Sequence, residues 1–244
     1  MPNSNIKFSF NIDAWAANSP GLSHPAAWQE WATTSLWPEA EPANVSAIPP
    51  MMRRRMSPLS KLAVQTAIEL LNLHSVDYLV FASRHGELHR SMSLIEAIIA
   101  GEDASPMAFS QSVHNTSAGL ATIATKKAIP LTSIAATEDT FQSALIEAWL
   151  FLSEYPDKKV LVIDFDQPLP EVYQAYETQQ YPGYSLGLVL SSGAQFAVET
   201  RELTAESAPI PQGLTFLQNY LLNKQQWTIN GSVHAWQWQQ KCKR

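Results

Sequence analysis

Several stretches of the chain have the apolar pattern of a β-strand. Residues Ile6–Ile12 alternate apolar and polar side chains, which is the period of a strand with one buried face. Asp77–Ala82 and Lys159–Phe165 are nearly continuous apolar runs, which are typical of strands covered on both faces. Tyr184–Ser191 and Gln195–Glu199 are predicted to be two antiparallel strands joined by a Ser-Gly turn.

Helical spacing of apolar residues predicts the elements between these strands. Ser57 is a preferred N-cap residue, Pro58 suits the first helical position, and apolar residues then recur at helical spacing as far as Leu71. Residues 37–50 are rich in proline and are predicted to be an irregular connection. Further helices are expected at Pro25–Thr34, Ser91–Ala100 and Leu214–Leu222.

The stretch Ser105–Leu152 is the one around which the chain is organised. It is predicted to form one helix over residues 105–127, a short extended run, a polar turn at Thr137–Thr140 and a second helix. A strand that enters a helix N-terminus is how many α/β enzymes present a nucleophile to free N–H groups. Here the turn contains Glu138 and Asp139 but neither cysteine nor serine.

The alternation of strands and helices over residues 57–165 predicts the α/β class. The expected architecture is a mostly parallel mixed sheet with helices on both faces. Residues 1–208 are predicted to form this domain, and residues 209–244 a C-terminal helix and a Trp-rich tail packed on the same domain. In that tail, Trp227, Trp236 and Trp238 are expected to clamp the domain's own surface.

The composition of the chain predicts a binding partner and a cellular compartment. Of 244 residues, 45% are hydrophobic and 16% are charged, so a partner is expected to cover part of the apolar surface. The net charge of −6 argues against nucleic-acid binding. The single cysteine, Cys242, allows no disulfide framework, and the apolar runs are too short to span a membrane. These features predict a cytoplasmic protein without membrane insertion.

Candidate catalytic groups are few. The six histidines do not have metal-ligand spacing, so neither a metal nor a cofactor is expected. Ser133 is not part of a G-x-S-x-G elbow. Glu138 and Asp139 have a structural interpretation as well as a chemical one, because acidic residues in the first turn of a helix stabilise it by roughly 0.3–1 kcal/mol each.

The order of these elements resembles the N-terminal half of a β-ketoacyl synthase of the thiolase fold. In that family a helix with an asparagine and an Ala-Gly pair precedes a strand and the turn S-I-A-T-A-C, which carries the nucleophilic cysteine. Asn115, Ala118-Gly119 and Ser133-Ile134-Ala135 match these features. Residues 49–63, PPMMRRRMSPLSKLA, also resemble the Arg-rich segment and first long helix of ketosynthases. The likeness covers about residues 1–200 and implies a thiolase-like N-terminal half.

The chain departs from that family at the groups that carry the chemistry. The cysteine position falls on Glu138 or Asp139, and the H-G-T-x-T and G-H histidine motifs of the family do not occur. Decarboxylative condensation needs a thiolate and two histidines. The chain therefore most resembles the short, non-catalytic chain-length-factor subunits of aryl-polyene biosynthesis, which form heterodimers with a full-length synthase.

The resemblance also implies a dimer interface and an acyl tunnel. The strand Pro130–Ala136, with Thr132, Ser133 and Ile134, would pair with its mate across the two-fold axis. The basic run Arg53–Arg55 is a candidate docking patch for an acidic acyl carrier protein. The residues matching the interface and the end of the partner's tunnel are Met107, Ala108, Phe109, Ser112, Val113 and Asn115.

Three interpretations remain open at this point. The chain is either that subunit or a small enzyme that hydrolyses or decarboxylates thioesters with Glu138, Asp139 or Ser133. The third interpretation is a small-molecule-binding α/β domain.

Overall fold

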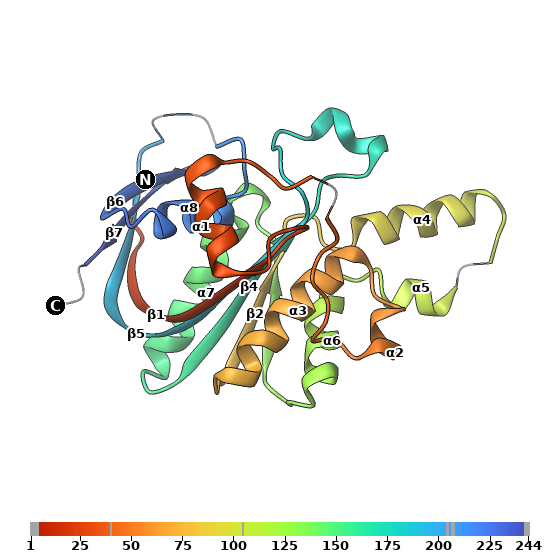
Figure 1. Ribbon diagram of the computed structural model, residues 1–244, viewed down its shortest axis with the longest axis horizontal. Helices are drawn as coiled ribbons and strands as arrows, with labels where there is room; N and C mark the ends of the chain where they lie inside the picture. The colour runs from red at the N-terminus through yellow and green to blue at the C-terminus, as the bar shows by residue number, and fades with distance from the viewer. Residues whose placement is uncertain (1–4, 40, 104, 204, 206–207, 242–244) are drawn as a thin grey trace.

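One seven-stranded sheet organises the computed structural model, which describes residues 5–39, 41–103, 105–203, 205 and 208–241 (Figure 1). Cys242 lies outside these residues. The strand order is β3-β2-β4-β5-β7-β6, and β1 pairs with β5. The strands are β1 (Lys7–Asn18), β2 (Tyr78–Ala82), β3 (Leu131–Ile134), β4 (Lys159–Asp166), β5 (Tyr184–Arg201), β6 (Gln226–Asn230) and β7 (Ala235–Gln240).

The predicted α/β class and mixed sheet are confirmed. Strand β2 is parallel to β3 and to β4, whereas β5 is antiparallel to β1, β4 and β7, and β6 is antiparallel to β7. Parallel pairing is thus confined to three strands, and the remainder of the described sheet is antiparallel. The sheet therefore has a smaller share of parallel pairing than expected, because the C-terminal tail adds the antiparallel strands β6 and β7.

The helices follow most of the predicted boundaries. The Ser57 side chain accepts a hydrogen bond from the Ser60 N–H at 2.9 Å, which confirms the predicted cap of α3. The helices are α1 (Pro25–Thr34), α2 (Pro50–Arg53), α3 (Pro58–Leu73), α4 (Leu88–Ile99), α5 (Pro106–Ser110), α6 (Thr116–Thr125), α7 (Thr140–Glu154) and α8 (Gln212–Leu221), with 3₁₀ turns η1 (Thr137–Asp139) and η2 (Glu171–Tyr176).

The predicted single helix over residues 105–127 is wrong, because this stretch forms two helices. The chain leaves helical geometry at Gln111, after α5, and α6 begins after Asn115. Between them, the His114 ring Nε2 lies 2.9 Å from the Ser83 carbonyl oxygen. This contact with the end of β2 holds the chain off the helix axis.

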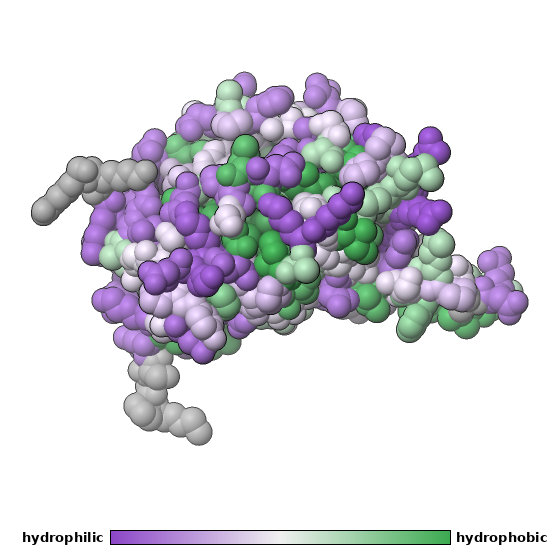
Figure 2. All heavy atoms as spheres, turned by 90° about the horizontal axis from the view of Figure 1, so that it is seen from below, coloured by the Kyte–Doolittle hydropathy of each residue, from purple (hydrophilic) through white to green (hydrophobic). Residues whose placement is uncertain are grey.

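Helices α4 and α5 project from the rest of the molecule as an arm, which comprises residues 88–103 and 105–113 (Figure 1). Figure 2 shows the same projection from below, with hydrophobic and hydrophilic side chains both on its surface. Neither helix has a buried residue. The arm therefore contributes little to the core of this chain.

The two strands predicted for residues 184–199 are one strand, β5. Both halves pair with β1, but Phe10 pairs with Phe196 while Asn11 pairs with Ser191, so residues 192–195 form a bulge. Asn11 spans the bulge by donating to the Ser192 carbonyl at 3.0 Å and accepting from the Gln195 N–H at 3.1 Å. The Ser-Gly pair is therefore a bulge rather than a hairpin turn.

Gly193 is required in this bulge because the Asn11 side chain leaves no room for a Cβ atom, and not because of its backbone angles. A Cβ at Gly193 would lie 2.1 Å from the Asn11 Oδ1 atom.

Two hydrophobic clusters cover the two faces of the sheet. Val160 and Val162 of β4 pack into the cluster that contains α7 and α8, whereas Leu161 and Ile163 pack into the cluster that contains α3 and α6. This alternation follows from the period-two geometry of a strand. Both clusters exclude water from the central strand, which explains its continuous apolar run.

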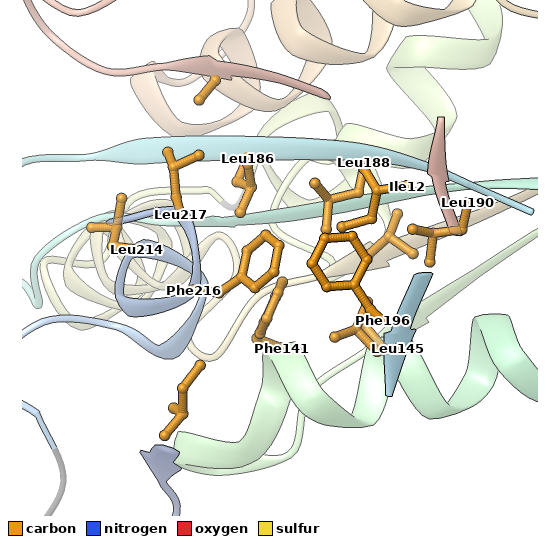
Figure 3. Packing of buried hydrophobic residues seen from close by; sticks show 14 of the residues in the cluster. Ile12, Phe141, Leu145, Leu186, Leu188, Leu190, Phe196, Leu214, Phe216 and Leu217 are labelled. Carbon is orange, nitrogen blue, oxygen red and sulfur yellow. The ribbon is translucent and has the colours of Figure 1, made fainter. Parts of the chain in front are cut away.

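The tryptophans of the tail belong to the core, so their predicted role as surface clamps is wrong. Trp238 of β7 is fully buried, with its ring centroid 4.8 Å from that of Phe216 and 5.6 Å from that of Trp227. Figure 3 shows Phe141 of α7 and Phe196 of β5 converging on Phe216 of α8. The alternation W-Q-W-Q-Q at residues 236–240 is the strand pattern that could have revealed this.

Replacing Trp238 by alanine is expected to lower the free energy of unfolding by about 3–5 kcal/mol, because it leaves a cavity among several aromatic rings. Urea denaturation at low protein concentration measures this change. Gln239→Ala, on the exposed face of the same strand, is the control and is expected to change stability by less than about 0.5 kcal/mol. Equal effects of the two substitutions would contradict the placement of Trp238.

Candidate functional site

Polar residues gather where the three parallel strands end. Ser83 and Arg84 follow β2, the turn with Glu138 follows β3, and Asp164 and Asp166 end β4. The carboxyl ends of parallel strands are where α/β proteins place their ligand sites. The predicted position of the lost cysteine is therefore the centre of this cluster.

The turn η1 carries backbone strain at the entrance to α7. Thr137 has φ 51°, in the left-handed region that β-branched residues rarely adopt. The Thr140 Oγ1 atom accepts a hydrogen bond from the Ala136 N–H at 2.9 Å and donates to the Thr137 carbonyl at 2.7 Å. These bonds hold a conformation that costs on the order of 1–3 kcal/mol.

Glu138 faces a cavity of about 570 Å³ together with Arg84. Its Oε1 atom lies 3.9 Å from the Arg84 Nη2 atom, so the carboxylate and the guanidinium form an ion pair. Thr137, Thr178 and Ser232 also line this cavity. One of the two residues predicted to stand at the nucleophile position is thus an acidic side chain paired with an arginine.

Asp139 is fully engaged by the C-terminal segment. Its Oδ1 atom accepts from Gln212 Nε2 at 3.0 Å and from Trp236 Nε1 at 2.9 Å. Its Oδ2 atom accepts from the Ser232 N–H at 2.9 Å and from the Ser232 Oγ at 2.6 Å. Burial raises the pKa of Asp139, but the hydrogen bonds from Ser232, Trp236 and Gln212 outweigh burial and lower that pKa below its ordinary value.

The Asp139 side chain has a structural role. It precedes α7, but its side chain makes no hydrogen bond to the start of that helix. The carboxylate instead connects the turn after β3 to the hairpin of β6 and β7. Its role in this structure is to join two parts of the chain.

Two glycines let the C-terminal segment approach closely. A Cβ at Gly231 would lie 1.9 Å from Asp139 Oδ1, and a Cβ at Gly213 would lie 2.1 Å from Asp164 Oδ2. Any other residue would displace these carboxylates. The segment that follows residue 208 therefore packs directly over the turn that carries the candidate site.

The sequence reasoning missed two buried carboxyl groups, Asp164 and Asp166. Asp166 accepts from the Ser83 hydroxyl at 3.0 Å and from the Arg84 and His85 N–H groups at 2.7 and 3.2 Å. Asp164 accepts from the Tyr184 hydroxyl at 2.7 Å. Two acids spaced by two residues in the apolar run KVLVIDFD were the available signal.

Burial is the largest influence on the pKa values of Asp164 and Asp166. It raises the pKa of Asp164 to about 8 against the opposing effect of the Tyr184 hydrogen bond, and it raises the pKa of Asp166 to about 7. Three donors face Asp166, two of them backbone N–H groups, whereas Asp164 has one hydroxyl partner, Tyr184, within the described part of the chain. Asp164 is consequently the group that keeps its proton at neutral pH.

Ser133 is not brought together with a general base. Its Oγ atom is buried on β3 and has no hydrogen-bond partner within the described part of the chain. A serine nucleophile needs an adjacent base to remove its proton. The structure does not supply that pair.

The predicted interface residues occupy two places, the arm and the edge strand. Met107 and Phe109 on α5 are 54% and 63% exposed, and Val113 is also exposed, whereas Ala108 and Ser112 are half-buried. Asn115 is exposed at the start of α6. Together with Ile95, Ile98 and Ile99 of α4, the exposed apolar residues Met107, Phe109 and Val113 form what we call the apolar surface of the arm.

Strand β3, with Thr132, Ser133 and Ile134, is the edge strand next to β2. One side of β3 has no partner strand in the described sheet. Unpaired edges of this kind are templates for pairing with another chain.

The basic run has one anchored and two exposed arginines. The Arg53 Nη1 atom lies 3.4 Å from the Val45 carbonyl oxygen, and Arg54 and Arg55 are exposed.

Among the described residues, no group of three or more histidine, cysteine or acidic side chains is arranged to hold a metal ion. The helices described are also too short or too polar to cross a membrane.

The raised pKa of Asp164 predicts a pH-dependent stability. Between about pH 4 and pH 8 the folded chain holds a proton that the unfolded chain releases, so raising the pH favours unfolding. The free energy of unfolding is expected to fall from pH 5 to 7.5, by up to about 1.4 kcal/mol per pH unit for this group. Asp164→Asn should reduce this slope in urea titrations and leave the part that Asp166 contributes below about pH 7, whereas Asp103→Asn, at an exposed carboxyl, should leave the slope unchanged. Identical slopes in all three proteins would refute the assignment.

Comparison with known proteins identifies the family. Residues 28–239 match the family described as "Beta-ketoacyl synthase, N-terminal domain". No curated protein matched the sequence. One similar solved structure is "Ketosynthase (ApeO) in Complex with its Chain Length Factor (ApeC) from Xenorhabdus doucetiae", with 32% identity, a TM-score of 0.88, and coverage of 95% of this chain and 99% of the matched chain.

More distant structures share the fold. "The ishigamide ketosynthase/chain length factor" is 17% identical with a TM-score of 0.63, and covers 80% of this chain and 67% of its own. A β-ketoacyl synthase from Burkholderia phymatum STM815 is 11% identical with a TM-score of 0.55, and the match covers 76% of this chain but 59% of the synthase. The sheet, the turn after β3 and these matches together show that the chain has the thiolase-like ketosynthase fold and belongs to the β-ketoacyl synthase N-terminal domain family.

Proposed function

We propose that the chain is a non-catalytic, ketosynthase-like chain-length-factor subunit. It pairs with a full-length β-ketoacyl synthase and shapes that enzyme's acyl tunnel during polyketide or aryl-polyene elongation. The observation that carries the proposal is the state of the turn after β3. Glu138 is paired with Arg84 there, and Asp139 accepts four hydrogen bonds from the C-terminal segment.

A catalytic ketosynthase needs the opposite arrangement at this turn. Its nucleophile must be a free thiolate that carries the acyl chain, with donors aimed at the reacting thioester. A carboxylate with a lowered pKa and four hydrogen-bond donors is a poor nucleophile and a poor base, since each donor stabilises its charge. The turn therefore supports a structural role over a chemical one.

Comparison with the complex from Xenorhabdus doucetiae supports the choice of partner. That complex contains a ketosynthase and its chain length factor, and coverage of 95% and 99% means that the matched chain is nearly the same length as this one. The Burkholderia synthase extends well beyond the matched part. The family's two histidine motifs do not occur in the 244 residues of this sequence.

The two exposed surfaces supply the interface that the proposal needs. The apolar surface of the arm and the unpaired edge of β3 would both be covered in a heterodimer. Obligate interfaces are large and apolar. The arm would reach over the end of the partner's tunnel, where Ala108 takes the place of the aromatic residue that fatty-acid synthases often have.

The carrier protein is the second proposed partner. Arg54 and Arg55 are exposed beside α2, where they offer positive charge to an acidic carrier.

The other two interpretations lack a supporting observation. An independent hydrolase or decarboxylase would need a base beside Ser133 or an available carboxylate, and the contacts of Ser133 and Asp139 supply neither. A small-molecule-binding domain would place its ligand in the cavity beside Arg84 and Glu138. Those two side chains already neutralise one another, so the cavity has no unmatched charge from this pair to select a ligand.

Co-expression with a full-length ketosynthase from the same source tests the proposal directly. Native mass spectrometry is expected to show a one-to-one complex, and turnover is expected to be lost on replacing the partner's nucleophilic cysteine. Glu138→Ala in this chain should leave turnover within about twofold, because Glu138 takes no part in the chemistry. Thioester hydrolysis by the lone chain, abolished by Glu138→Ala, would show that it is an enzyme instead.

The tunnel role predicts an effect of Ala108→Phe on product length. The added ring would fill space at the end of the partner's tunnel, so the complex should release shorter products, which liquid chromatography and mass spectrometry resolve. Ser110→Phe adds the same bulk on the opposite side of α5 and serves as the control. Unchanged product length in Ala108→Phe would contradict the assignment of this residue.

A further inference from the structure

The arm is attached to the rest of the chain mainly through its two ends. Neither α4 nor α5 has a buried residue, so apolar packing contributes little to holding them in place. The residue that immediately precedes α4 is different, because Glu87 is a carboxylate with only 3% of its surface exposed. A buried charge is costly unless it is paired and hydrogen-bonded, so its partners define the geometry at this point.

Glu87 joins the root of the arm to two helices of the body. Its Oε1 atom accepts hydrogen bonds from the Ser57 hydroxyl, at 2.8 Å, and from the Ser60 hydroxyl. The Ser60 Oγ atom is also within 3.0 Å of the Ser117 Oγ atom on α6. Since Ser57 caps α3, a single carboxylate oxygen connects the arm to the first turns of α3 and α6.

The second oxygen of Glu87 forms an ion pair within the first turn of the arm and has no hydrogen-bond partner in the described part of the chain. Its Oε2 atom lies 3.5 Å from the Arg90 Nε atom. The Arg90 Nη2 atom donates to the Arg55 carbonyl at 2.7 Å, which ties the same turn to the segment before α3. Arg90 thereby fixes the direction in which α4 leaves the body.

The other end of the arm returns to the same place. His114, just after the arm, contacts the Ser83 carbonyl, and Gly86 at φ 55° passes so close that a Cβ there would lie 2.9 Å from His114 Cδ2. The Ser91 hydroxyl bridges the two ends by donating to the Ser112 carbonyl at 3.4 Å. Entry and exit are therefore held side by side, and Glu87 is the buried charged group among these contacts.

We propose that Glu87 is a positioning residue that sets the angle of the arm and thereby the product length of the complex. The inference rests on the proposed function. Helix α4 has 12 residues and is about 18 Å long, so a rotation of about 10° at its root moves its far end by about 3 Å. Met107, Ala108 and Phe109 on α5 belong to the same arm, so the rotation also shifts them and changes how far they reach into the partner's tunnel.

The test uses the complex with the full-length ketosynthase and four variants of this chain. Glu87→Ala removes every side-chain contact of Glu87, and Glu87→Gln keeps an acceptor oxygen for Ser57 and Ser60. Arg90→Ala removes only the ion pair with Glu87 and the hydrogen bond to the Arg55 carbonyl. Glu96→Ala removes an exposed carboxylate from the same helix and is the matched control. The readouts are the distribution of product lengths and amide hydrogen exchange over α4 and α5.

Glu87→Ala is expected to broaden the length distribution and to raise amide exchange in α4 and α5 by at least about tenfold. Glu87→Gln should restore most of the wild-type distribution, and Glu96→Ala should match wild type. Arg90→Ala should show the same changes to a smaller degree, because the Arg90 side chain is partly exposed. If Glu87→Ala does not fold, Arg90→Ala tests the inference in its place.

Wild-type product lengths and wild-type exchange in a folded Glu87→Ala complex would overturn the inference, as would an unaltered Arg90→Ala complex if Glu87→Ala fails to fold. Failure of the wild-type chain to form any complex would instead refute the proposed function. In that case, exchange over α4 and α5 in the lone chain still measures whether Glu87 holds the arm.

Discussion

The hydrogen bonds to Asp139 are the interaction on which the rest of the structure depends. This carboxylate, in the turn after β3, binds three residues that follow residue 208 and so joins the C-terminal segment to the centre of the fold. Hydrogen bonds to a charged acceptor are stronger than neutral ones, and the loss of one partner leaves a partly buried charge unsatisfied. These hydrogen bonds hold the C-terminal segment closed over the turn that follows β3.

This closure accounts for the C-terminal hairpin and for the buried aromatic cluster. Strands β6 and β7 extend the sheet beyond β5, and Trp238 packs between α7 and α8 under the same hairpin that Ser232 anchors. Gly213 and Gly231 permit the close approach to Asp164 and Asp139. A chain that spans about three fifths of the Burkholderia synthase completes one sheet and two cores by this means.

The surfaces that remain open lie away from this closure. The arm presents apolar residues to the outside, and β3 leaves one edge of the sheet unpaired. The arm is attached to the body by hydrogen bonds at its root, where Glu87 is buried against Ser57 and Ser60. A polar root is compatible with an apolar outer surface, because the packing that would otherwise hold the helices is left available for a partner.

The sequence by itself determined those elements that depend on residues close to one another along the chain. The Ser57-Pro58 start of α3, the boundaries of α1, the run of β4 and the absence of a thiol at residue 138 follow from neighbouring residues, and so did the resemblance to a ketosynthase. Tertiary structure decided the bulge at residues 192–195, the break between α5 and α6, and the strands of the tail. It also decided the partners of Asp139, which lie 73 to 97 positions away along the chain. Each of these depends on a contact between residues distant in sequence, and a local pattern of apolar and polar positions carries no information about which distant partner a side chain meets.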